Sequence, residues 1–227
     1  MLFIDREGIM KIGVEQITLL LLGALGIVAC GDQIDKSIDD KPKNRDTALT
    51  FVNALNDDAR FYLQPQVMIG DVFQEKYKAA DLLKNDYRSY LYAWNKDHHK
   101  TTFGVRDNNS NNKQHKLDAN LTDGGRTWVV AWMKGNDYQL SVFEKSPRNR
   151  SDTITLRVLA SVDMDVAVDG NVLSRAKSGV VSAHISVEHC SGSLFLANHP
   201  IDLCQRDYGR SYLAVADQNG LRVVVEE

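Results

Sequence analysis

The sequence predicts an all-β protein with two tandem antiparallel β-sandwich domains. From Thr47 onward, short runs of β-branched and aromatic residues alternate with polar residues at the period of two that a half-buried strand requires. Clusters of Gly, Asn and Asp separate these runs at intervals of about 8–12 residues, a spacing typical of β-sandwiches. Several runs also recur in the same order in the two halves of the chain. The net charge of −3 provides no basic surface, so we expect no nucleic-acid partner.

The N-terminal region predicts an export signal. Residues 17–29 are largely apolar but shorter than the roughly 20 residues that a membrane-spanning helix needs. Their length suits the hydrophobic region of a signal peptide, and small residues lie near its end. Met10, which a lysine follows, gives a more typical signal-peptide start than Met1. We therefore assign residues 1–29 to a signal peptide, with Met10 as an alternative initiator.

The apolar run ends in the residues Ile27-Val28-Ala29-Cys30. This junction resembles the lipobox of bacterial lipoproteins. The resemblance implies that Cys30 becomes the first residue of the mature chain and carries a thioether-linked diacylglycerol and an N-acyl chain. Stable anchoring needs more than one acyl chain, and this modification meets that need. The alternative is an ordinary N-terminal membrane anchor with an incidental cysteine.

The residues after Cys30 predict a flexible tether and an address. Residues 30–46 contain few apolar side chains other than Ile34 and Ile38, and they are rich in charged and polar residues. By the lipoprotein resemblance, Gly31 in place of an aspartate favours the outer membrane over the inner one. We expect a protein of the bacterial cell envelope that is lipid-anchored in the outer membrane, at its periplasmic face or on the cell surface.

The remaining cysteines predict a disulfide. With Cys30 assigned to the lipid, Cys190 and Cys204 form an even pair in an oxidising compartment. A bridge between them closes a loop of about 15 residues and stabilises the fold by roughly 3 kcal/mol in the chain-entropy model. Two free buried thiols are the alternative, and the sequence favours the bridge.

The first sandwich domain is expected at residues 47–147. Residues 75–83 favour a helix of two turns. Residues 97–123 contain an asparagine-rich stretch and are expected to form a long surface insertion, which is also the best place to look for partner contacts. The expected strands are residues 49–53, 60–63, 87–94, 128–132 and 139–143.

The second sandwich domain is expected at residues 152–227, after a polar boundary that contains a proline. The dipeptide Asp169-Gly170 between apolar flanks predicts a tight hairpin. The expected strands are residues 154–159, 165–168, 180–187, 193–196, 212–216 and 221–225.

An internal repeat supports the two-domain organisation. Residues 125–129 match residues 209–213, and residues 140–144 match residues 221–225 with an allowance for one gap. Chance similarity between β-rich segments is the alternative. The shared order of several features favours a duplicated domain. The openings of the two copies also correspond, at residues 51–54 and 157–160.

Several short motifs of the second half carry a resemblance to a known family. The motifs are residues 157–160, 165–170, 179–185, 192–195 and 212–225. On these residues the second half is similar to the Ig-like β-sandwich repeats of bacterial envelope proteins known as domain of unknown function four-three-nine-seven. The resemblance implies tandem Ig-like sandwiches without established catalytic residues, and it extends less clearly over the first half.

Three polar clusters are candidate sites, but their patterns favour ordinary surface positions. No calcium-loop pattern accompanies the acids, no zinc motif accompanies the histidines, and no G-x-S-x-G motif contains the serines. We therefore expect no metal, no cofactor and no catalytic residue. The clusters are Asp163, Asp165 and Asp169; His98, His99 and His115; and Ser191 and Ser193 with His189 and His199.

Alternating aromatic residues give the remaining candidate site. Tyr90, Tyr92 and Trp94 lie on one face of the strand expected at residues 87–94. An exposed face of this kind could bind a glycan or a peptide, but filling the sandwich core is favoured.

Together these features predict a non-enzymatic binding or structural module that contacts the membrane through its lipid and an unknown envelope protein or glycan. The alternatives are a glycan- or peptide-binding surface protein, and an envelope hydrolase that uses loop histidines and aspartates.

Overall fold

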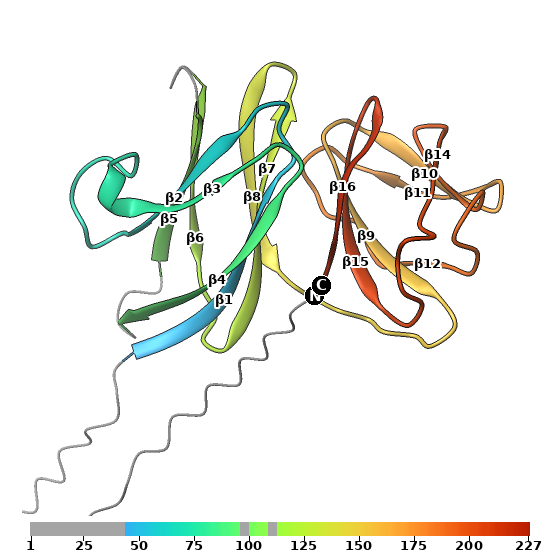
Figure 1. Cartoon of the computed structure of the whole chain (residues 1–227), viewed down its shortest axis with the longest axis horizontal. Coiled ribbons are helices and arrows are strands. Elements are labelled where there is room, and N and C mark those ends of the chain that lie inside the picture. Colours follow the sequence, from blue (N-terminus) through green and yellow to red (C-terminus); the bar gives the residue numbers. More distant parts are fainter. Residues whose placement is uncertain (1–43, 96–99, 109–112) are drawn as a thin grey trace, which may run out of the picture. The chain divides into compact units, whose positions relative to one another are not determined.

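The computed structural model describes residues 44–95, 100–108 and 113–227 (Figure 1). The described chain is built almost entirely of β-strands, which confirms the predicted all-β fold. The strands form four four-stranded sheets that pack in pairs. From Asn44 onward, the described residues belong to one compact unit.

The first sandwich pairs a sheet of strand order β4-β1-β7-β8 with a sheet of order β3-β2-β5-β6. Its core lies between them and includes Phe51, Phe61 and Phe103, each fully buried. The strands are β1 (Asn44–Asn53), β2 (Ala59–Pro65), β3 (Lys78–Leu82), β4 (Tyr87–Asn95), β5 (Lys100–Asp107), β6 (Gln114–Asn120), β7 (Gly125–Lys134) and β8 (Asp137–Glu144).

The second sandwich pairs a sheet of order β12-β9-β15-β16 with a sheet of order β11-β10-β13-β14. Its core is aliphatic apart from Tyr212. The strands are β9 (Ile154–Ala160), β10 (Met164–Val168), β11 (Asn171–Ala176), β12 (Ile185–Val187), β13 (Leu194–Leu196), β14 (His199–Ile201), β15 (Ser211–Asp217) and β16 (Gly220–Glu226).

The two sandwiches share one topology. Each strand of the second occupies the place of the strand numbered eight lower in the first. In both, the first strand pairs in parallel with the seventh, β1 with β7 and β9 with β15, and every other pairing is antiparallel. The internal repeat therefore has a structural counterpart, strand by strand.

The alignment that the sequence suggested is wrong by one residue in two pairs of equivalent strands. At the opening it matched Phe51 of β1 with Arg157 of β9, but Phe51 lies in the inner core and Arg157 contacts Phe143 on the outer face.

The same shift occurs between β7 and β15. The alignment matched Trp128 with Tyr212, but Trp128 lies on the outer face of its sandwich and Tyr212 lies in the inner core. The counterpart of Trp128 by strand pairing is Leu213, because a shift of one residue moves a strand side chain to the opposite face. The gap expected in the last strand falls at a β-bulge, where the pairing shifts between Val215 and Ala216.

A third apolar cluster joins the outer faces of the two sandwiches. It combines β7 side chains such as Trp128 and Trp132 with Leu159 of β9 and Leu213 of β15, all nearly inaccessible to solvent. The sheets β4-β1-β7-β8 and β12-β9-β15-β16 each have one face in a sandwich core and the other face in this cluster, so both of their faces are apolar. This explains why β9 is buried along its whole length.

One buried ion pair lies beside this cluster. Arg157 of β9 contacts the carboxylate of Glu227 and also donates a hydrogen bond to the carbonyl of Glu144 at 3.1 Å. Glu227 accepts a further bond from the indole nitrogen of Trp128 at 3.0 Å. Burial raises the pKa of Glu227, but the hydrogen bonds from Arg157 and Trp128 and the Arg157 charge outweigh it, so this pKa lies below its ordinary value.

Three predicted elements are corrected by the structure. Residues 75–83 form a three-residue 3-10 turn, η1 (Glu75–Tyr77), followed by strand β3, because Ala80 and Leu82 alternate into the core at the period of a strand. Residues 97–123 are not an insertion: they supply β5 and β6, two regular strands of the sheet. Within residues 180–187, only Ile185–Val187 form a strand, and Val181 makes an isolated bridge.

Two further predictions are confirmed. Cys190 and Cys204 form a disulfide with a Cα–Cα distance of 4.7 Å. Asp169 and Gly170 form the two-residue turn between β10 and β11, both with the positive φ that this hairpin requires.

Candidate functional site

The predicted site residues are not gathered into one place. Cys30, His98 and His99 lie outside the described residues. The disulfide of Cys190 and Cys204 closes a loop in the second sandwich. The remaining aromatic, acidic, histidine and serine candidates are spread over both sandwiches.

The aromatic face of β4 points mainly into the core. Tyr92 and Trp94 are 8% and 5% exposed, and their rings stack at a centroid distance of 5.9 Å. Tyr90 is 46% exposed. The three side chains share a strand face, but the opposing sheet covers two of them, so they form no open platform for a glycan or peptide. The core interpretation of Tyr92 and Trp94 is the one that the structure supports.

The polar candidates have local structural roles. Asp163 accepts a hydrogen bond from the backbone of Ser178 at 2.9 Å, and Asp165 lies opposite Arg175 in the ladder of β10 and β11. Burial lowers the pKa of His115 on β6. Ser193 is buried. Across residues 44–95, 100–108 and 113–227, no group of three or more His, Cys, Asp or Glu side chains is placed to hold a metal ion.

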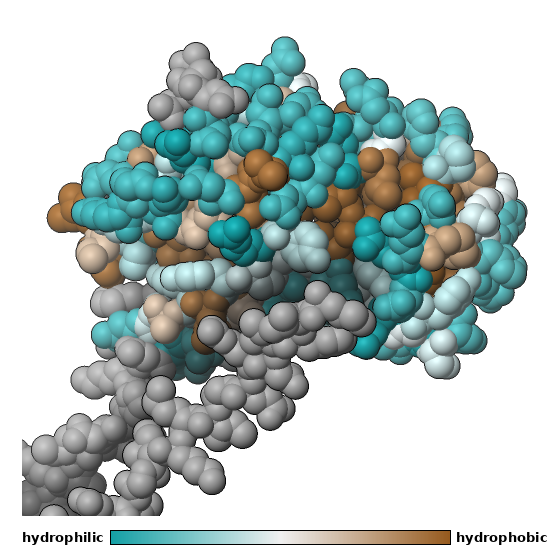
Figure 2. Space-filling view, viewed as in Figure 1, coloured by the Kyte–Doolittle hydropathy of each residue, from teal (hydrophilic) through white to brown (hydrophobic). Residues whose placement is uncertain are grey.

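The connection between β2 and β3, residues 66–77, carries three consecutive exposed apolar side chains, one of which is the most exposed large hydrophobic side chain of the described residues. Val67 and Met68 are 51% and 52% exposed, and Ile69 is 97% exposed. We call residues 67–69 the apolar tip. Figure 2 shows hydrophobic surface at the extremity of this connection, at the left edge of the view. Single exposed apolar residues are common on proteins, but three in succession mark a candidate contact surface.

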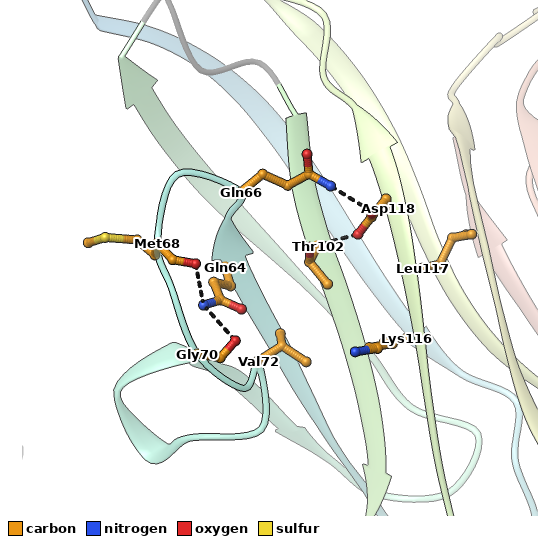
Figure 3. Close-up of a pocket in the computed structure, with 9 residues that line it drawn as sticks. All are labelled: Gln64, Gln66, Met68, Gly70, Val72, Thr102, Lys116, Leu117 and Asp118. Atoms are coloured by element: carbon orange, nitrogen blue, oxygen red, sulfur yellow. Dashed lines mark hydrogen bonds between the residues drawn. The ribbon is translucent and has the colours of Figure 1, made fainter.

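Hydrogen bonds from a buried glutamine fix the backbone of the tip. Gln64 is 4% exposed, and its side-chain amide donates to the carbonyls of Met68 at 3.0 Å and of Gly70 at 3.4 Å. The backbone N–H of Met68 donates to the carbonyl of Pro65 at 2.9 Å, which closes a tight turn. In Figure 3 the side chain of Met68 points away from these bonds and away from the sheet. The tip is therefore held outward by its own backbone.

The other end of the connection packs on the outer face of the sheet. The ring of Phe73 meets the ring of Tyr62 edge-on at a centroid distance of 5.4 Å, and the guanidinium of Arg106 lies 4.4 Å from its centroid. Gly104 of β5 lies directly beneath Phe73: a Cβ there would be 2.9 Å from the ring. Tyr62 would face solvent from this side of the sheet, yet it is 2% exposed because the connection covers it.

An open groove of about 490 Å³ separates the tip from the hairpin of β5 and β6. Asp118 closes one side, where its carboxylate accepts hydrogen bonds from Gln66 at 2.6 Å and from Thr102 at 2.7 Å. Figure 3 shows Lys116 directed across the groove toward the connection. The groove contains no nucleophile beside a base, so its geometry suits contact with another molecule more than chemistry.

Sequence reasoning missed this surface although a signal was present. Val67, Met68 and Ile69 are consecutive apolar residues between Pro65 and Gly70, two residues typical of turns. An apolar run inside a turn is unusual unless it has a function. The covering role of Phe73 could not be read from the chain, because it depends on a glycine in a strand well downstream.

The comparisons with known proteins leave the family open. No family model matches the chain, and no curated protein matches it. The resemblance of the second half to Ig-like envelope repeats therefore stays a prediction. Among the residues that the structure describes, no helix is long and apolar enough to cross a membrane.

Proposed function

We propose that the protein is a lipid-anchored component of the bacterial cell envelope whose paired sandwiches act as a non-enzymatic interaction module. The observation that carries the proposal is the disulfide between Cys190 and Cys204. Disulfides persist in oxidising compartments, which supports export. The bridge also leaves Cys30 as the one remaining cysteine, directly after an apolar run with the pattern of a lipobox.

The contact surface supports the second half of the proposal. The apolar tip and its groove are open, are held by hydrogen bonds and packing, and lack a catalytic arrangement. Surfaces of this kind serve binding, since exposed apolar patches on a soluble domain mark contact sites. The aromatic face of β4 offers less support for glycan binding, because Tyr92 and Trp94 are buried.

Metabolic labelling tests the anchor. The full chain is expressed in a bacterium that is fed an alkyne fatty acid, and labelled protein is detected after coupling to a dye. We expect label on the wild type and none on Cys30→Ser. The double variant Cys190→Ala/Cys204→Ala is the matched control and keeps the label. Equal labelling of Cys30→Ser and the wild type would refute the anchor.

Photo-cross-linking in intact cells tests the surface. A photoreactive amino acid replaces Ile69 in one variant and Val180, a residue of similar type that is 56% exposed, in the other. We expect a discrete adduct, to lipid or to protein, from position 69 and none from position 180. The absence of any adduct at position 69 would remove the tip from the proposal.

A further inference from the structure

We propose that the apolar tip, residues 67–69, inserts into the surface of the membrane that carries the lipid anchor. The first sandwich would then touch the bilayer at a second point and hold a fixed orientation on it. This inference rests on the proposed function, because it requires the lipid on Cys30.

The tip lies at the end of the first sandwich where the chain from Cys30 enters. Strand β1 begins at Asn44, which pairs with Asn95 at the end of β4. Lys100 begins the next strand, and its carbonyl accepts a hydrogen bond from the backbone of Gln66 at 3.1 Å, at the base of the tip. Only four residues separate Asn95, the partner of Asn44, from Lys100 at the base of the tip.

A second set of contacts places the tip at the same end. Lys100 pairs with Asn120 at the end of β6. Three residues later, Asp123 accepts a hydrogen bond from the backbone of Asp46 at 3.2 Å and forms an ion pair with Arg45 at 3.8 Å. The start of β1 and the base of the tip are therefore connected through both β4 and β6.

The length of the connecting chain keeps this end close to the bilayer. Residues 31–43 separate Cys30 from β1. A chain of that length spans at most about 45 Å when fully extended. The end of the sandwich that carries the tip is thus confined within a few nanometres of the lipid surface, so even a weak contact acts at high effective concentration.

The composition of the tip matches a lipid interface. Val67, Met68 and Ile69 are apolar and without charge, and flexible methionine adapts to irregular apolar surroundings. Charged side chains of both signs lie beside the tip: Lys116 and Asp118 line the groove, and Asp71 lies near Lys116. The attraction would therefore be hydrophobic, and it would need no anionic lipid and depend little on salt.

The rigidity of the tip favours insertion over disorder. Its backbone is already fixed by Gln64, and its base is fixed by the packing of Phe73 on Tyr62. A preorganised loop loses little conformational freedom when it binds. The apolar side chains lie at the end of the tip, and the hydrogen bonds of Gln64 to the backbone lie at its base. The boundary between water and lipid would therefore fall close to Gly70.

Fluorescence quenching by brominated lipid tests the inference on the full lipidated chain. The protein with Ile69→Trp is reconstituted into vesicles of zwitterionic phosphatidylcholine, with or without bromine on the upper acyl chain. The native Trp94, Trp128 and Trp132 are at most 6% exposed and provide a constant background. Leu173→Trp in β11, at a side chain 57% exposed, is the matched control.

We expect Ile69→Trp to add emission of which about half or more is quenched, since an interfacial apolar group lies roughly 5–10 Å into the headgroup–acyl boundary. The emission that Leu173→Trp adds should be unaffected. Equal quenching of both variants, or of neither, overturns the inference. If quenching disappears at high protein concentration because the protein self-associates, the tip binds a second copy of the chain and the inference is overturned.

Mass spectrometry of the peptide containing Cys30 keeps the two proposals separate. A lipidated Cys30 without quenching at position 69 overturns the inference alone. An unlipidated Cys30 overturns the proposed function and the inference with it. A discrete protein adduct at position 69 in cells, without lipid adducts, assigns the tip to a protein partner and overturns the inference while the proposed function stands.

Discussion

The buried pair of Arg157 and Glu227 should make a large contribution to the stability of the folded unit. The side chain of Arg157 is 8% exposed and that of Glu227 is inaccessible. Removing one partner from a buried ion pair leaves an uncompensated charge and costs about 3–5 kcal/mol. In the variant Arg157→Met, Glu227 keeps its bonds from Trp128 at 3.0 Å and from the backbone of Ser146 at 3.3 Å. We therefore expect a loss near the lower limit, about 3 kcal/mol.

Urea denaturation of the full chain in mild detergent at neutral pH measures this loss. Arg210→Met is the matched control, because Arg210 and Glu226 form an ion pair in which both side chains are more than half exposed. Exposed pairs contribute about 0–1 kcal/mol. The comparison therefore separates the buried charge from the general effect of replacing an arginine by methionine.

A double-mutant cycle and a pH series complete the test. If Glu227→Gln is combined with Arg157→Met, the stranded charge is gone, and the double variant should lose less than the sum of the single variants by about 0.5–3 kcal/mol. Because the pKa of Glu227 is lowered in the folded protein, its contribution is present above the ordinary value of 4.5 and disappears as the pH falls through the folded pKa. A loss below about 1 kcal/mol in Arg157→Met, or strict additivity, would refute the reasoning.

Four further predictions concern the rest of the fold. Reduction of the disulfide, or Cys190→Ala/Cys204→Ala, should lower the free energy of unfolding by roughly 3 kcal/mol in the chain-entropy model, and an unchanged urea midpoint would argue against it. Trp94→Ala should cost about 3–5 kcal/mol, whereas Tyr90→Ala at an exposed position should cost far less; similar losses would contradict the core assignment. Gly104→Ala should displace Phe73 and speed proteolytic cleavage within residues 66–77, with the disulfide loop as internal reference; unchanged cleavage would show that Phe73 is not a clamp. Burial and the charge of Arg126 lower the pKa of Lys145 to about 8 in the folded protein, from its ordinary value of 10.5. Between pH 8 and 10.5 the unfolded chain therefore binds more protons than the folded protein, so the free energy of unfolding should rise with pH over this range. The variant Lys145→Met should lack this rise.

The strands were most predictable where they are buried and rich in β-branched and other apolar residues. Residues 154–159 and 212–216 gave strong signals because β9 and β15 are buried. β6 was missed because it lies at a sheet edge: its residues alternate only between half-buried and exposed, and most are polar. The sequence of β3 favoured a helix locally, but the burial of Ala80 and Leu82 between the sheets overrides that propensity.

The site was harder to predict because its parts come from separate segments. The disulfide followed from cysteine counting and compartment, which need no three-dimensional information. The outward tip depends on Gln64 beneath it, and the covering role of Phe73 depends on the missing side chain at Gly104. In the sequence, nothing distinguishes Gln64, Phe73 or Gly104 from an ordinary strand or loop residue.

One difference between the two sandwiches lies at the connection that carries the tip. Where the first has residues 66–77 between β2 and β3, the second has only the turn Asp169-Gly170 between β10 and β11. Both preceding strands carry a pairing shift, at Tyr62 in β2 and at Ala167 in β10, and these residues pair with Gly104 and Phe195 respectively. An aromatic residue is thus associated with the same position of both sheets.

The source of that ring differs. In the second sandwich Phe195 supplies it from its own strand, whereas in the first the strand has a glycine and the connection supplies Phe73. The glycine at position 104 therefore creates the seat on which the connection is held. A long surface loop that only bridged two strands would need no such seat, since loops tolerate extra length at little cost. The combination of a glycine at this strand position with a docked loop supports the proposal that the connection serves to hold the apolar tip.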